Sequence, residues 1–186
     1  MLGHMDDAEW MLEQLWAPIV AITAGHEGRT NGLISSTAVT ASLLPEAPRL
    51  TVQLARASLT RELVLAAKAF AVHLLPANER GLELFRRLGF RTGREEAKLE
   101  GVATQQGTLT APILSDAVAY VEAQLVQTLE TEDMTVIVAN VVEGARLRAA
   151  PLLTIEYVRE RLPVDWVVEW ERRRERELED ARRFRR

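Results

Sequence analysis

The sequence of 186 residues contains no cysteine, which excludes disulfides, thiolate metal ligands and a cysteine nucleophile. Histidine is also scarce. The three histidines, His4, His26 and His73, fall in separate segments without the spacing of metal ligands. We therefore expect no metal centre. His73 stands between apolar residues in a strand pattern, which is more typical of a hydrogen-bonded core histidine than of a ligand.

Long apolar runs are missing as well. No stretch approaches the roughly 18 residues that cross a bilayer. The N-terminus, with Asp6, Asp7 and Glu9, lacks the basic and then apolar plan of a signal peptide. We expect a soluble, cytoplasmic protein without a membrane partner. The net charge of −4 argues against a nucleic-acid partner, because phosphate binding normally needs a basic face.

Several catalytic motifs are absent. The chain has no P-loop, no Rossmann glycine pattern and no nucleophile-elbow serine, which argues against kinase and hydrolase functions. The sequence motifs therefore identify no catalytic residue.

The composition, 47% hydrophobic and 27% charged, is typical of one globular domain. We expect a domain over residues 1–165, followed by an arginine-rich helical extension over residues 166–186. No Pro/Gly/Ser linker divides the chain.

Strand patterns outnumber helical patterns in the body of the chain. Short strands are predicted over residues 18–24, 49–55 and 69–75, another strand begins near Leu33 after a loop over residues 25–32, and two long paired strands cover residues 117–130 and 135–147. Helices are predicted over residues 58–68 and 78–88, and a surface loop over residues 89–107. The expected fold is mainly β with flanking helices.

The extension predicts a solvated helix capped by Asp165. Its opposite charges have i,i+4 spacing in the pairs Glu169/Arg173, Arg176/Asp180 and Glu179/Arg183. Its apolar positions, Trp166, Trp170, Leu178 and Ala181, fall roughly on one side, which suits packing on a barrel formed by the predicted strands or on a partner subunit. A structural role is the simpler interpretation, and contact of the terminal arginines with RNA or a membrane surface is the alternative.

Residues 31–42 form the first of two hydroxyl-rich stretches. The hydroxyl side chains are Ser35, Ser36, Thr37, Thr40 and Ser42. Neutral donors of this kind suit the pyrimidine edge of a flavin, and small residues allow the backbone to approach the ring. Ordinary serine and threonine usage in an edge strand explains the composition equally well.

The second stretch, Arg56, Ser58 and Thr60, lies between a predicted strand and the start of a helix. Free N–H groups, the helix dipole and the arginine together favour a phosphate monoester there. The alternative is that Ser58 or Thr60 simply caps the helix.

The two stretches, in this order and at this separation, resemble the flavin reductase-like family. The family's N-G-x-x-x-S and following S-x-S-x-x-P segment is similar to Asn31, Gly32, Ser36, Thr40, Ser42 and Pro45, and its S-x-T before a helix to Ser58 and Thr60. Its F-x-V-x-x-L strand is similar to Phe70, Val72 and Leu75, and its late proline-leucine to Pro151 and Leu152. The resemblance covers roughly Trp16 to Leu153.

The resemblance implies a six-stranded antiparallel split barrel that binds FMN at the interface of a homodimer. FAD remains an alternative cofactor. By position, Asn31, Gly32, Ser35, Ser36 and Thr37 would lie along the ring and ribityl chain, Thr40 and Ser42 near the ring, and Arg56, Ser58 and Thr60 at the phosphate.

One departure from the family pattern concerns the residues near the expected nicotinamide site. Many reductases of the family carry G-D-H between the last two long strands, where this chain has Glu132, Asp133 and Met134. Hydride passes directly from nicotinamide to flavin, so the change does not exclude reductase activity. His26 could substitute, although a solvated loop histidine is the simpler interpretation.

Three functions follow as hypotheses. The first is an NAD(P)H-dependent flavin oxidoreductase, with NAD(P)H as a transient substrate and a partner monooxygenase as one candidate acceptor of reduced flavin. The second is an FMN carrier or electron-transfer flavoprotein. The third is a split-barrel scaffold whose tail recruits a partner.

Overall fold

A computed structural model describes residues 18–185 of the chain. The expectations about the acidic N-terminus and His4 concern residues outside this range.

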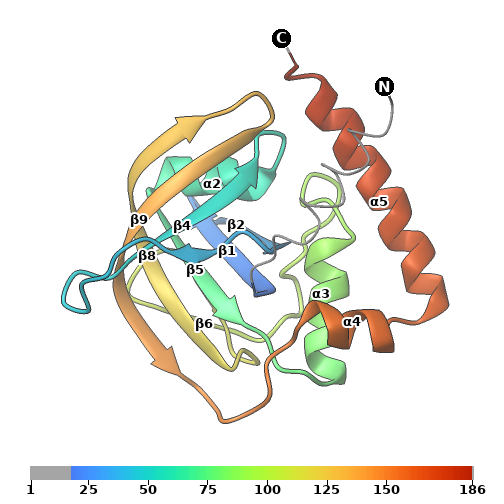
Figure 1. Cartoon of the computed structure of the whole chain (residues 1–186), viewed down its shortest axis with the longest axis horizontal. Helices are drawn as coiled ribbons and strands as arrows, with labels where there is room; N and C mark the ends of the chain where they lie inside the picture. Colours follow the sequence, from blue (N-terminus) through green and yellow to red (C-terminus); the bar gives the residue numbers. More distant parts are fainter. Residues whose placement is uncertain (1–17, 186) are drawn as a thin grey trace, which may run out of the picture.

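In this range the main sheet has seven antiparallel strands in the order β2-β1-β5-β8-β9-β4-β3. The strands are β1 (Val20–His26), β2 (Arg29–Ser35), β3 (Val39–Thr40), β4 (Arg49–Ala55), β5 (Ala69–Leu74), β8 (Ala119–Glu130) and β9 (Met134–Arg146). A separate pair joins β6 (Thr104–Gln106) to β7 (Pro112–Leu114). The sheet curls on itself (Figure 1). The mainly β split-barrel prediction is confirmed, with seven strands rather than six because the two-residue β3 extends the edge beside β4.

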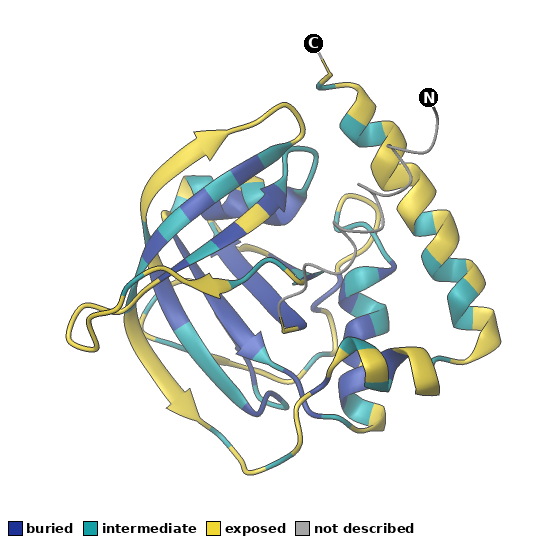
Figure 2. Ribbon diagram, in the orientation of Figure 1, coloured by how far each residue is buried: buried dark blue, intermediate teal, exposed yellow. Residues whose placement is uncertain are grey.

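The concave side of the curled sheet holds the larger apolar core. Ile22, Val52, Phe70 and Ile137 come from four different strands and are fully buried there. The alternating pattern of β4 places Leu50, Val52 and Leu54 on this side, as strand periodicity requires. Figure 2 shows these strands dark blue toward the interior.

Within residues 18–185, four helices accompany the sheet: α2 (Leu59–Ala67), α3 (Glu79–Gly89), α4 (Ile155–Arg161) and α5 (Val164–Arg182). Asn78 caps α3, because its side chain accepts a hydrogen bond from the Gly81 N–H at 3.0 Å. A second core cluster lies around α3 and includes Leu88, Phe90 and Val158. The helices therefore flank the barrel, as predicted.

Two loop predictions need correction. The first hairpin turns tightly at Glu27 and Gly28, which have positive φ values of 48° and 76°, so β2 begins at Arg29 rather than near Leu33. The segment over residues 89–107 is not a surface loop throughout, because Lys98 and Leu99 are buried and β6 lies within it. Periodicity could not detect these contacts, because the segment buries single residues rather than a face.

The C-terminal helix is present, but its predicted details were partly wrong. It begins at Val164, and Asp165 lies in its first turn without capping it. Glu169 pairs with Arg86 of α3 at 2.8 Å rather than with Arg173, which pairs with Glu177 at 2.7 Å. Asp180 pairs with Arg183 at 3.1 Å. Neighbouring elements, which helical spacing ignores, decide which charges meet.

The helix packs on α3 of its own chain. Trp170 lies 6.1 Å from the Phe90 ring in a stacked arrangement and 5.9 Å from Phe85 edge-on. The Arg86 guanidinium lies 4.5 Å from the Trp166 ring centroid. In Figure 1, α5 stands beside α3, away from the curled sheet. None of the helices in residues 18–185 combines the length and apolar character needed to span a membrane.

Candidate functional site

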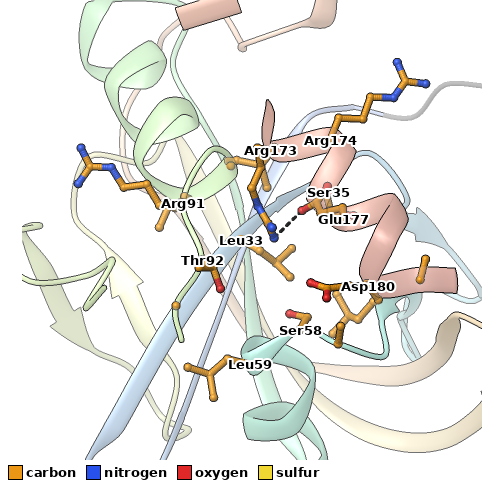
Figure 3. Close-up of a pocket in the computed structure, with 18 of the residues that line it drawn as sticks. Leu33, Ser35, Ser58, Leu59, Arg91, Thr92, Arg173, Arg174, Glu177 and Asp180 are labelled. Atoms are coloured by element: carbon orange, nitrogen blue, oxygen red, sulfur yellow. Dashed lines mark ion pairs between the residues drawn. The ribbon is translucent and has the colours of Figure 1, made fainter. Parts of the chain in front are cut away.

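A cavity of about 390 Å³ lies between the end of β2, the end of β4, the start of α2, the loop after α3 and one face of α5 (Figure 3). This volume falls in the range of about 300–1,000 Å³ that is usual for small-molecule sites. Leu33, Leu54, Leu59 and Leu88 contribute apolar walls. The cavity thus combines an apolar body with polar groups from several elements.

The end of β2 and the turn after it supply neutral hydroxyls. Ser35, Ser36 and Thr37 line the cavity, as does the Asn31 amide from the middle of β2. The hydroxyls of Ser35 and Thr37 lie 2.8 Å apart, and Thr37 Oγ1 donates to the Gln53 carbonyl at 3.1 Å and accepts from the Gln53 N–H at 2.9 Å. These bonds tie the turn after β2 to β4, which fixes the hydroxyls at the cavity wall.

Asn31 links three parts of the site. It is buried, and its Nδ2 donates to Thr60 Oγ1 in the first turn of α2 at 3.0 Å. The loop after α3 lies over the same amide, since a Cβ on Gly93 would come within 2.4 Å of it. Gly93 is therefore required for this close approach, because any side chain would displace Asn31 or the loop.

The start of α2 has an uncommitted hydroxyl. Ser58 occupies the N-cap position with extended backbone, lines the cavity, and makes no side-chain capping bond. The Thr60 hydroxyl is directed to Asn31 instead. Neither residue caps the helix in the usual way, so the first N–H groups of α2 and the Ser58 hydroxyl are available to a ligand at the positive end of the helix.

Cationic side chains surround the cavity. Lys98 is 5% exposed, and its Nζ donates to the Leu88 carbonyl at 2.7 Å. Burial, with repulsion from Arg173 as a smaller cause, lowers the pKa of Lys98 to about 8. Arg94 donates to the Ala57 carbonyl and pairs with Glu62. In Figure 3, Arg91 and Arg174 extend outward, whereas Arg173 extends inward from α5.

The structure brings together only part of the residue set predicted from sequence. Asn31, Ser35, Ser36, Thr37 and Ser58 line the cavity, and Gly32, Thr40, Ser42, Arg56 and Thr60 are not among its lining residues.

The remaining predicted residues have other surroundings. Thr40 lines a separate apolar groove, and Ser42 Oγ accepts from the Leu44 N–H at 3.1 Å. Arg56 lies against the β8–β9 turn, 3.3 Å from Glu130, and its guanidinium is 4.6 Å from the Phe184 ring centroid.

Sequence reasoning missed Lys98, the loop around Gly93 and the charged residues of α5. The one available signal was the single-sided placement of Trp166, Trp170 and Ala181, which indicated a packed helix but not what it covers.

The two described histidines lie away from the cavity lining. His73 is fully buried, with Nδ1 3.2 Å from the Ala21 carbonyl and Nε2 accepting from the Leu114 N–H at 3.1 Å. Burial lowers the pKa of His73 to about 4, so the ring is neutral. His26 pairs with Glu27 at the first hairpin turn. Asp133 and Met134, at the β8–β9 turn, do line the cavity. No group of three metal-ligating side chains occurs among the described residues.

Comparison with known proteins adds a family match. Residues 12–162 match the sequence profile of the flavin reductase like domain. The chain is 29% identical over 147 residues to a high molecular weight rubredoxin of Moorella thermoacetica, covering 78% of this chain and 63% of that protein.

Two further relatives are more evenly matched in length. A ferric-chelate reductase (NAD(P)H) of Archaeoglobus fulgidus is 30% identical over 134 residues, which cover 72% of this chain and 78% of the reductase. The crystal structure of a flavin reductase domain protein from Arthrobacter sp. FB24 superposes with a TM-score of 0.70 at 25% identity, covering 80% of this chain and 89% of that one.

Proposed function

Because the chain belongs to the flavin reductase-like family, we propose that it binds FMN and acts as an NAD(P)H-dependent flavin oxidoreductase. The observation that carries the proposal is the cavity itself. Neutral hydroxyls at the end of β2 face it from one element, and the uncapped start of α2 faces it from another. A flavin mononucleotide needs both, because its pyrimidine edge is neutral and its phosphate is an anion.

The residues present fit such a ligand. Leu33, Leu54 and Leu59 supply apolar surface for a ring system. Asn31 has one amide hydrogen committed to Thr60, and Ser35 and Thr37 are positioned by bonds to each other and to β4. Ser58 and the first N–H groups of α2 would hold the phosphate, with Arg94 close to the same corner through its bond to Ala57.

When bound, FMN would accept a hydride from the nicotinamide ring of NAD(P)H and pass electrons on. The protein's task is then to bind and orient the two rings and to limit access of water. The leucine walls and α5 would exclude water, and the hydroxyls of Ser35, Ser36 and Thr37 would orient the flavin edge. No general acid or base is required of Met134, which stands where the G-D-H motif of many reductases of the family would place a histidine.

The similarity to the Archaeoglobus relative, a ferric-chelate reductase (NAD(P)H), supports a nicotinamide nucleotide as the proposed reductant. We propose the electron acceptor only by chemical class, as free flavin. The reduced flavin would then be used by a partner protein such as a monooxygenase.

A homodimer is the assembly we propose. A second, smaller groove of about 220 Å³ is almost wholly apolar and is lined by Val20, Val39, Leu50, Leu74 and Val121 among others. Val39 is half exposed. A second copy covering this face would remove apolar surface from water. Light scattering should give twice the monomer mass of 20.8 kDa at micromolar concentration with FMN present, and a monomer mass would contradict the assembly.

A flavoprotein that retains FMN and carries electrons is the second candidate. The position of α5 against the cavity favours it, since a covered cofactor exchanges slowly. Gel filtration separates the two: co-elution of FMN with the protein supports the carrier, and loss of FMN to the buffer supports the reductase.

The test of the proposed function has two parts. Fluorescence titration should show tighter binding of FMN than of riboflavin, and equal dissociation constants would contradict a phosphate site. Anaerobic addition of NADH or NADPH to the FMN complex should bleach the flavin absorbance. A complex that stays oxidised with both nucleotides is not a reductase.

A further inference from the structure

Helix α5 lies outside the matched family segment, which ends at residue 162, yet it forms part of the cavity wall. Its inward face changes character along its length. Trp166 and Trp170 of the first turns pack against the cluster around α3, and Arg173, Glu177 and Ala181, which continue the same stripe at i+3 and i+4 spacing, line the cavity. The helix thus turns its charged section to the cavity.

Both ends of this section are held in place. Trp170 is stacked on Phe90 before it, and Phe184 lies 4.6 Å from the Arg56 guanidinium after it. The charged section is therefore positioned by contacts on either side, rather than by the ion pairs of a free surface helix.

Arg173 is the side chain of this section that enters the cavity. Only 19% of the side chain is exposed, and Nη2 pairs with Glu177 Oε1 at 2.7 Å. Among the described residues, its Nε is one of two buried side-chain nitrogens that make no hydrogen bond. Figure 3 shows Arg173 extending from α5 toward Leu33, with Ser58 on the opposite side of the same space. A buried N–H without an acceptor costs free energy unless a ligand supplies one.

The local charge also favours an anion. Lys98 is almost fully buried, and Arg173 is close enough to lower its pKa by repulsion. The nearby carboxylates are already paired, since Glu177 pairs with Arg173 and Glu96 with Arg91. The other acid of α5 at the cavity, Asp180, is already paired with Arg183. An excess of positive charge away from water is stabilised when an anion joins it.

We propose that Arg173 is a phosphate-binding residue of the flavin site, supplied by α5 and acting across the cavity from Ser58. This inference rests on the proposed function and names a ligand contact that the family segment does not contain. A guanidinium suits the role because its planar array of donors can keep Glu177 and still bind phosphate oxygens.

The test compares three variants in the full-length chain. Arg173→Gln removes the charge, Arg173→Lys keeps it, and Arg172→Gln is the matched control, because Arg172 is exposed and does not line the cavity. Fluorescence titration should show FMN binding weakened about tenfold or more in Arg173→Gln and riboflavin binding within about threefold of wild type. Arg173→Lys should recover part of the FMN affinity, and Arg172→Gln should match wild type.

Other results would overturn the inference. Unchanged FMN affinity in Arg173→Gln removes Arg173 from the site, and equal weakening of FMN and riboflavin places its effect on the ring or on folding, which circular dichroism then separates. Weaker binding of NADPH with unchanged FMN would assign the arginine to the nicotinamide nucleotide instead. If wild-type protein binds neither flavin, the proposed function fails before the variants are compared.

Discussion

The barrel and α5 enclose the same cavity but are held in place in different ways. The barrel buries whole side chains from several strands, including Ile22, Phe70 and Ile137, whereas none of the 19 residues of α5 is fully buried. Figure 2 shows this contrast as a dark interior and a largely yellow helix. The barrel wall of the cavity therefore rests on removal of apolar surface from water, and the α5 wall on a few aromatic and ionic contacts.

This difference predicts that α5 is less stable than the barrel. Partly exposed ion pairs such as Arg86–Glu169 contribute about 0–1 kcal/mol each, and aromatic pairs about 0.5–1.5 kcal/mol. Together these contacts stabilise α5 by less free energy than the burial of a core strand contributes to the barrel. We expect α5 to open more readily than the barrel, which would let a ligand in without unfolding the domain.

The largest expected effect is in the barrel. Phe70→Ala should lower the free energy of unfolding by about 3–5 kcal/mol, because it leaves a cavity in a fully buried site. The matched change in α5, Leu178→Ala at a half-exposed position, should cost less than about 1 kcal/mol. Urea unfolding measures both, and similar losses would remove the distinction between the two regions.

Acid should weaken the barrel through His73. Its pKa is 6.5 in the unfolded chain and about 4 in the folded protein, so the unfolded chain takes up the proton first as pH falls. The stability from the neutral ring is complete above pH 6.5 and is lost as pH falls toward 4, by roughly 3 kcal/mol in total.

Urea unfolding at several pH values between 7 and 4 tests this effect. A His73→Gln variant should show a smaller fall in stability over that window than wild type. Parallel pH profiles for the two proteins would mean that His73 keeps its ordinary pKa in the fold.

At the cavity, Ser58→Ala should weaken FMN binding about ten- to a hundredfold, since a hydrogen bond to a charged group contributes about 1.5–3 kcal/mol. Riboflavin binding should stay within a few-fold. The melting temperature of the apo protein should hardly change, because Ser58 makes no capping bond. Thr60→Ala is a less direct test, since it also leaves the Asn31 amide without its partner. FMN affinity equal to wild type in Ser58→Ala would place the phosphate elsewhere.

Trp170→Ala is expected to act on α5 alone rather than on the whole domain. The change removes two aromatic contacts, with Phe85 of α3 and with Phe90 directly after it, each of about 0.5–1.5 kcal/mol. Hydrogen exchange should speed up in α5 and remain unchanged in β5 and β8. Exchange that rises equally in the barrel would show that α5 is part of the same cooperative unit.

Local pattern was enough for most of the barrel. The strand over residues 49–55 and the helices near 58–68 and 78–88 lie where alternation and helical spacing put them, because each buries one regular face. The hydroxyls at residues 35–37 and Ser58 could be selected from the sequence by residue type, and they do line one cavity.

Only the tertiary structure decided the rest of the site. Lys98 and Gly93 belong to a segment without periodicity, and their roles depend on α3 and Asn31, which approach from elsewhere in the chain. The same holds for α5. The sequence predicted a charged helix over residues 166–186 with two tryptophans on one side, but Glu169 pairs with Arg86 and Arg173 enters the cavity because of how the helix docks. Helical propensity and spacing act within a few residues, whereas docking depends on surfaces that exist only once the barrel and α3 have folded.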